Sequence, residues 1–174
     1  MPNIEIKAKY PDHNKAKEIL IKLNATFVGT DHQIDTYFKT EKGRLKIRES
    51  SLSGTQLIPY MRPDQQGPKK SNYAVIPLQN TENCKQLFTN LLGQDVVVDK
   101  IRDIYLIDNV RVHLDKVKDL GSFFEFEAVY QESKNEENEY RKVQELLATF
   151  DIKQEDLITG SYKEMTQQIT SPAL

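Results

Sequence analysis

The chain has 174 residues, of which 38% are hydrophobic and 29% are charged, and its formal net charge is -2 at pH 7. This composition predicts one soluble domain with a core of ordinary size. It excludes a general electrostatic attraction to nucleic acid or to an acidic membrane, so a polyanion would have to be bound by a local group of Lys and Arg. The single cysteine, Cys84, excludes an intrachain disulfide and favours a reducing compartment. No apolar run is long enough to cross a bilayer, and we expect a cytoplasmic protein.

The first predicted element is a strand over residues 3–9, in which charged and apolar side chains alternate. Its charged side chains are Glu5, Lys7 and Lys9, which share one face because successive strand residues point to opposite sides. Asp12 is then expected to cap a helix that ends near residue 23. Further strands are predicted over residues 25–29, 32–38, 44–50, 56–62 and 73–78.

A proline-bounded basic segment, residues 63–71, separates the last two of these strands and predicts a flexible loop. Its Lys69 and Lys70 suggest a lid over a binding site. A mobile surface loop explains the same composition equally well.

The second half of the chain starts with a helix over residues 81–92 that Thr81 can cap. A long strand over 95–106 and a strand over 110–115 form a predicted hairpin around the turn Asp108-Asn109. The remaining expected elements are a strand over 122–130, a helix that follows the acidic stretch 131–139 and ends at Phe150, short helical turns at 154–157 and 161–165, and a frayed tail. We therefore expect a single domain over residues 1–165 and a C-terminal tail over 166–174.

Charged stripes recur on several strands, although charged residues are depleted in strands as a rule. The stripes are Arg44, Lys46 and Arg48; Arg111, His113 and Asp115; and Glu125 and Glu127. Each stripe alone is compatible with a solvated strand face, and Glu125 and Glu127 could simply form structural salt bridges. Three cations on one face repel each other, however, unless something anionic lies against them.

The predicted fold class is α+β, most simply an antiparallel β-barrel of about eight strands with helices packed outside. If the apolar faces lie outward under the helices, the charged faces line the interior. Buried ions are costly unless they are paired or solvated, so such a lumen is expected to be wet and to hold an anion. A triphosphate suits this demand, because it is long and highly charged and brings a divalent metal that carboxylates can hold.

The opening strand resembles the Glu-x-Glu-x-Lys signature of the CYTH superfamily, the triphosphate tunnel metalloenzymes, and most closely its class IV adenylyl cyclase-like branch. The likeness extends through residues 32–38, 43–49, 60–63 and 121–127. It implies an eight-stranded tunnel that binds ATP, thiamine triphosphate or inorganic triphosphate with Mg²⁺ or Mn²⁺. The implied reaction is either cyclisation to cyclic AMP or hydrolysis of the terminal phosphate.

The resemblance also implies roles for individual residues. Glu5, Lys7 and Arg62 would be catalytic. The implied metal ligands are Glu5, Asp115, Glu125 and Glu127. The implied contacts to phosphate are Lys7, Lys9, Arg44, Lys46, Arg48, Arg62, Lys100, Arg102 and Arg111. His113 is interpreted as part of the tunnel wall and not as a catalytic base.

The first Glu of the signature is Asn3 in this chain. An amide can offer a carbonyl oxygen to a metal, but it lacks the charge and basicity of a carboxylate. The alternative function is therefore a triphosphate- or polyphosphate-binding module with weakened chemistry. RNA binding on an open basic sheet is disfavoured by the net charge and by the lack of aromatic residues among the basic stripes. We expect no nucleic-acid or membrane partner, and either a monomer or a homodimer.

Overall fold

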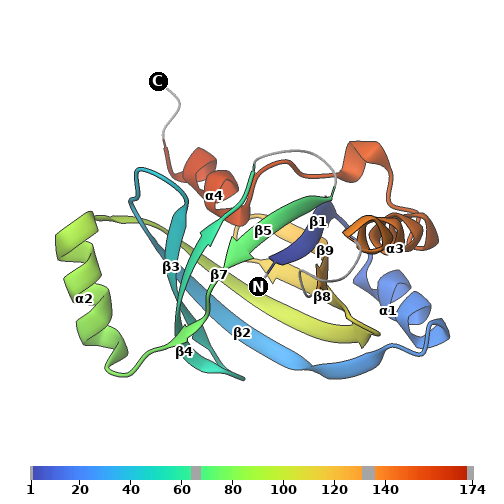
Figure 1. Ribbon diagram of the computed structural model, residues 1–174, viewed down its shortest axis with the longest axis horizontal. Coiled ribbons are helices and arrows are strands. Elements are labelled where there is room, and N and C mark those ends of the chain that lie inside the picture. The colour runs from blue at the N-terminus through green and yellow to red at the C-terminus, as the bar shows by residue number, and fades with distance from the viewer. Residues whose placement is uncertain (1, 64–67, 131–135, 172–174) are drawn as a thin grey trace.

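The computed structural model describes residues 2–63, 68–130 and 136–171, without the side chains of Pro2 and Lys69. Its strands pair antiparallel in the order β3-β2-β7-β8-β9-β1-β5-β4, and a further pairing of β3 with β4 closes them into an eight-stranded barrel (Figure 1). The predicted α+β barrel is confirmed. The strands are β1 (Pro2–Lys9), β2 (Thr26–Phe38), β3 (Arg44–Ser50), β4 (Gly54–Met61), β5 (Lys69–Tyr73), β6 (Ile76–Pro77), β7 (Gln94–Ile107), β8 (Val110–Val117) and β9 (Gly121–Val129).

Helices cover the outside of the barrel (Figure 1). They are α1 (His13–Lys22), α2 (Thr81–Leu92), α3 (Glu136–Thr149) and α4 (Tyr162–Thr170), with a 3₁₀ turn at Gln154–Asp156. None of the helices in the described part of the chain has the length and apolar character that a membrane span requires.

The apolar faces of the strands point outward, as predicted, and form the core beneath α1 and α3. Ile4, Ile6, Phe124 and Phe126 belong to this core and are at most 2% exposed. Phe150 closes it, with its ring centroid 4.7 Å from that of Phe124 and 5.6 Å from that of Phe126. Because the apolar faces are used outward, the opposite faces of the same strands are left to line the interior.

The strand β2 corrects one prediction. The sequence indicates two strands over residues 25–29 and 32–38, but the structure has one strand of 13 residues. Its register against β7 shifts between Phe27 and Gly29. The glycine therefore marks a β-bulge, at which pairing continues, and not the end of a strand.

The prediction of a basic loop over residues 63–71 is wrong at the C-terminal end of that segment. Lys69–Tyr73 form β5, which pairs with β1 so that Lys69 lies opposite Glu5. Lys70 Nζ lies 3.3 Å from a carboxylate oxygen of Glu136. Residues 64–67 of the predicted loop lie outside the described residues. The strand predicted over 73–78 is replaced by the end of β5 and the two-residue β6.

The N-terminal cap of α1 agrees with the prediction, and that of α2 differs from it. Asp12 caps α1 by accepting a hydrogen bond of 3.0 Å from the Lys15 backbone N–H. Asn80, not Thr81, precedes α2, and the Thr81 hydroxyl donates instead to Thr55 over 2.8 Å. The described part of α3 starts at Glu136, and residues 131–135 are outside the description.

The C-terminal helix is longer than the predicted turn at 161–165. Helix α4 continues to Thr170, so residues 166–170 are helical and not a frayed tail. Its first turn carries the capping pair Ser161 and Glu164, a pattern that favours helix initiation.

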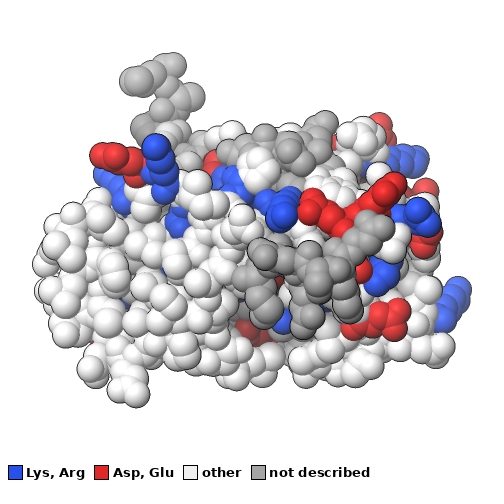
Figure 2. All heavy atoms as spheres, in the orientation of Figure 1, with Lys and Arg blue, Asp and Glu red and all other residues white. Residues whose placement is uncertain are grey.

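Helix α2 contributes little to the core, because none of its residues is buried. Its Phe88 ring contacts Phe38 with centroids 5.5 Å apart. On the face shown in Figure 2, charged side chains gather over the part of the molecule that carries α1, α3 and α4, whereas the end that carries α2 is largely free of them.

Candidate active site

A cavity of about 130 Å³ lies inside the barrel and is lined mainly by polar side chains. Among its described lining residues the cations outnumber the carboxylates. The six cations are Lys7, Lys46, Arg48, Arg62, Lys100 and Arg102, and the four carboxylates are Glu5, Asp35, Glu125 and Glu127. The strand alternation therefore brings most of the predicted site residues together. Their roles in binding remain predictions.

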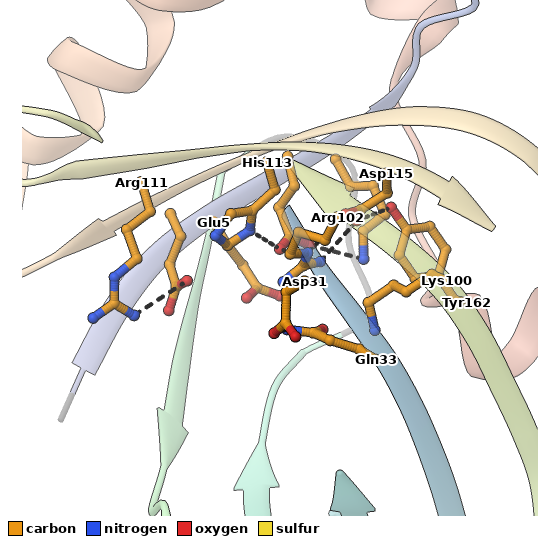
Figure 3. A network of polar contacts seen from close by, with 12 residues as sticks. Glu5, Asp31, Gln33, Lys100, Arg102, Arg111, His113, Asp115 and Tyr162 are labelled. Carbon is orange, nitrogen blue, oxygen red and sulfur yellow. Dashed lines mark hydrogen bonds and ion pairs between the residues drawn. The ribbon is translucent and has the colours of Figure 1, made fainter. Parts of the chain in front are cut away.

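The Arg102 cluster comprises Arg102, His113, Asp115, Glu125 and Tyr162, which converge from β7, β8, β9 and α4 (Figure 3). Arg102 donates two hydrogen bonds of 2.7 Å to Asp115 and a third of 3.2 Å to Glu125. The Tyr162 hydroxyl donates to Asp115 over 2.7 Å. His113 Nδ1 lies 2.9 Å from Glu125. Both carboxylates are therefore matched by donors on several sides.

The carboxylates of this cluster stay ionised despite their burial. Burial alone would raise the pKa of Asp115, but the Arg102 guanidinium outweighs it and lowers that pKa to about 2. Lys7 and Arg102 similarly hold the pKa of Glu125 well below its usual value against the effect of burial. The Lys7 ammonium lies 2.9 Å from Glu125 and 3.9 Å from the ring centroid of Tyr162.

The Asp35 cluster places three cations around one buried carboxylate, namely Lys46, Arg48 and Lys100. Arg48 donates two hydrogen bonds of 2.7 and 2.8 Å to Asp35. Lys46 and Lys100 donate one each, over 2.9 and 3.0 Å. Asp35 is 1% exposed. One carboxylate cannot neutralise three cations, so this part of the cavity has a positive excess.

The pKa values of the two lysines are lowered first by burial and then by the neighbouring cations. Burial lowers the pKa of Lys100 to about 8, and neighbouring arginines add to the effect although Asp35 opposes it. Burial and Arg48 hold the pKa of Lys46 well below its usual value. An anion placed beside these lysines would favour their charged forms.

The Asn3–Arg62 cluster comprises Asn3, Glu5, Arg62 and Glu127, which all line the cavity. Arg62 forms an ion pair with Glu5. The Arg62 side chain is 4% exposed, and its Nε and Nη2 atoms are buried without a hydrogen-bond partner among the described residues. Asn3 Nδ2 donates to Glu127 over 2.7 Å, while Asn3 Oδ1 is buried without a partner. This cluster therefore has unsatisfied donors and an unsatisfied acceptor.

Four predicted site residues lie elsewhere. Lys9, the last residue of β1, is exposed and does not line the cavity. The Arg111 side chain is 47% exposed and lies 3.8 Å from Glu127. Arg44 is buried beside α4, where it donates to Glu164 over 2.6 Å. Asp115 is enclosed by its partners in the Arg102 cluster. These four residues do not line the cavity, because a shared strand face does not guarantee access to it, and their roles stay predictions.

Several cavity residues were not identified from the sequence. Asp35 and Tyr37 share one face of β2 with Gln33, so the strand period gave a signal for them. The hydroxyls of Tyr37 and Tyr60 lie 3.3 Å apart in the cavity wall. Tyr162 gave no local signal, because its contact with Asp115 spans 47 residues of chain.

The metal ligands implied by the resemblance can be tested against this geometry. Among the described His, Cys, Asp and Glu residues, no three are grouped as a metal site. Glu5 and Glu127 are nevertheless cross-strand partners on β1 and β9, and the Asn3 amide NH₂ donates to Glu127. Mg²⁺ is commonly held by one or two carboxylates together with substrate phosphates. The residues fit an ion that is shared with a phosphate ligand.

Comparison with known proteins finds relatives that match nearly the full length of this chain. A protein from Methanocaldococcus jannaschii named "Putative adenylate cyclase" is 28% identical over 175 residues, covering 95% of this chain and 98% of that protein. A solved structure from Pyrococcus horikoshii has a TM-score of 0.80 at 24% identity and covers 93% of this chain and 98% of its own.

A solved structure from Hippeastrum has the same fold at lower similarity. It is named a "Putative adenylyl cyclase" with a dominant triphosphatase activity, and its TM-score is 0.63 at 13% identity, covering 99% of this chain and 97% of its own. The family model described as the CYTH domain matches residues 1–162. Given this match and the closed barrel around a charged cavity, the chain belongs to the CYTH domain family.

Proposed function

We propose that this chain binds a triphosphate in the barrel cavity and catalyses its metal-dependent cleavage, as a phosphohydrolase or an adenylyl cyclase. One observation carries the proposal: the cavity holds more cations than carboxylates, and Arg62 offers two buried N–H donors without partners. An unsatisfied buried donor costs about 1–3 kcal/mol. Phosphate oxygens supply both the acceptors and the negative charge that this cavity lacks.

The cations divide between two parts of the phosphate chain. Lys46, Arg48 and Lys100 of the Asp35 cluster supply the positive excess that binds one end, and Arg62 with Lys7 binds the other. Each of these side chains is anchored by a carboxylate, which holds it in place before the ligand arrives. Such preorganised cations stabilise the charge that moves onto phosphate oxygens during phosphoryl transfer.

Glu5 and Glu127 would hold Mg²⁺ or Mn²⁺ beside the phosphates. A divalent ion bound there neutralises phosphate charge and orients the reacting group. Glu5 also anchors Arg62, so it serves both the metal and the phosphate contact. The Arg102 cluster would act mainly as wall, since its carboxylates are already saturated with donors.

The orientation of the substrate decides between the two reactions. Attack of a ribose hydroxyl on the α-phosphate releases pyrophosphate, whereas attack of water on the terminal phosphate releases phosphate. The names of the relatives agree with both reactions: the archaeal protein is named "Putative adenylate cyclase", and the name of the Hippeastrum structure gives a dominant triphosphatase activity.

The test is to incubate the purified chain with ATP, thiamine triphosphate and inorganic triphosphate, each with Mg²⁺, Mn²⁺ or EDTA. Cyclic AMP with pyrophosphate identifies the cyclase, and phosphate release identifies the hydrolase. Binding without products would instead support the binding-module alternative that Asn3 suggests. Absence of both binding and products with all three compounds would overturn the proposal.

A further inference from the structure

Asn3 is the one position of the family signature at which this chain has an amide in place of a carboxylate. Its side chain is buried in the cavity wall, with Asn3 2% exposed. Glu127 can only accept hydrogen bonds when ionised, so the 2.7 Å contact requires the amide NH₂ to face it. The carbonyl oxygen of Asn3 is thereby turned away from Glu127 and is left buried without a partner.

The charges around Asn3 already cancel. Glu5 is ion-paired with Arg62, and the Glu127 carboxylate faces the Arg111 guanidinium 3.8 Å away. Asn3 contributes no charge of its own. A divalent cation that entered alone would meet two carboxylates already balanced by two guanidinium groups. It would then be desolvated with no net electrostatic gain.

A polyphosphate changes this balance. Its oxygens can accept hydrogen bonds from the unpartnered Nε and Nη2 atoms of Arg62. They also bring several negative charges next to Glu5 and Glu127. A divalent cation then finds phosphate oxygens and carboxylate oxygens together, which is the kind of oxygen set that such ions prefer.

Resting on the proposed function, we infer that Asn3 makes divalent-cation binding conditional on the polyphosphate: the protein takes up the cation with its ligand and not before it. A glutamate at this position would add a third carboxylate beside Glu5 and Glu127. Such a site would have net negative charge without any phosphate and would bind the cation in advance.

The experiment uses the full chain, Mn²⁺ as the metal and inorganic triphosphate as the polyphosphate. Protein-bound Mn²⁺ is measured by the enhancement of water-proton relaxation, which separates Mn²⁺ on the slowly tumbling protein from Mn²⁺ on free triphosphate. For the wild type we expect enhancement only when triphosphate is present. The apparent affinity for Mn²⁺ should rise at least about tenfold with triphosphate, a normal size for coupling between two sites.

Two variants isolate the effect of residue 3. Asn3→Glu should bind Mn²⁺ alone at least about tenfold more tightly than the wild type, with a smaller further gain from triphosphate. Asn14→Glu adds the same charge at an exposed position of α1 and should behave like the wild type. Thermal melts establish that both variants are folded. If Asn3→Glu does not fold, the wild-type comparison still decides the question.

Wild-type protein that binds Mn²⁺ equally well with and without triphosphate would overturn this inference and leave the proposed function intact. Titration calorimetry with triphosphate, in EDTA and in Mn²⁺, separates the two claims. If triphosphate binds in neither condition, the proposed function fails and the inference fails with it.

Discussion

The Arg102 cluster and the Asp35 cluster lie in the same barrel and are both buried, but their charges are balanced differently. In the Arg102 cluster two carboxylates share a guanidinium, an ammonium, an imidazole and a tyrosine hydroxyl. In the Asp35 cluster one carboxylate serves three cations. Carboxylates that are fully matched by donors hold strands together, whereas cations that outnumber their carboxylate require a further anion. The first cluster is therefore suited to stability and the second to binding.

The Asn3–Arg62 cluster extends the contrast from charge to hydrogen bonding. Three of its buried polar atoms, namely Asn3 Oδ1 and Arg62 Nε and Nη2, lack a partner among the described residues. Unpartnered buried polar atoms are rare in native proteins and call for an explanation. A ligand with phosphate oxygens would satisfy the two Arg62 donors.

The largest effect is expected from Arg102→Met, which breaks the saturated cluster. Asp115 and Glu125 would keep their burial but lose their shared counter-charge. Breaking a buried pair by removing one partner costs about 3–5 kcal/mol, and we expect the free energy of unfolding to fall by that amount in urea titrations. Arg111→Ala, at a half-exposed ion pair, is the control and should cost at most about 1 kcal/mol. Equal losses in the two variants would contradict the assignment of the Arg102 cluster to stability.

The next effect is expected in binding. Arg62→Ala removes the two unpartnered donors of the Asn3–Arg62 cluster. A hydrogen bond to a charged group contributes about 1.5–3 kcal/mol, so triphosphate affinity should weaken at least about tenfold in titration calorimetry. Arg141→Ala, an exposed position of α3, provides the matched control. An affinity unchanged by Arg62→Ala would show that its free N–H groups do not face the ligand.

Arg48→Ala tests the surplus charge itself. Asp35 would retain its contacts with Lys46 and Lys100, so the carboxylate stays compensated and the fold should remain intact by thermal melting. Triphosphate affinity should weaken about tenfold, since one charge-assisted contact is lost. A large loss of stability with unchanged affinity would show that Arg48 stabilises the fold and does not contact the ligand.

The strand period was sufficient to predict the barrel and the face on which each charge lies. Side-chain parity follows from local sequence, and the apolar faces of β1, β8 and β9 are indeed the outer ones. The β-bulge at Gly29 was not predictable in the same way, because a glycine in a strand pattern marks either a bulge or a break.

Partners across the barrel could not be predicted from the strand pattern. Strand parity places both Arg48 and Arg102 on the interior face. The closed sheet then determines that Arg48 contacts Asp35, whereas Arg102 contacts Asp115 and Glu125. Lys9 shows the converse error, since it has the correct parity but lies at the end of its strand, outside the cavity. Closure of the barrel determines these contacts, and closure depends on strand pairings distant in sequence.

The smallest effect is expected from pH, and it sharpens the assignment of the Asp35 cluster to binding. Lys100 has a pKa of about 8 before ligand binds, because burial and neighbouring arginines oppose its charge. Triphosphate favours the protonated form, so its binding raises this pKa, and affinity should fall as pH rises through the lower value. Lys100→Arg stays protonated over the same range and should lose less affinity. The ligand's own titration affects both proteins equally, so the difference between their profiles reports on Lys100. Parallel profiles would show that Lys100 does not contact the anion.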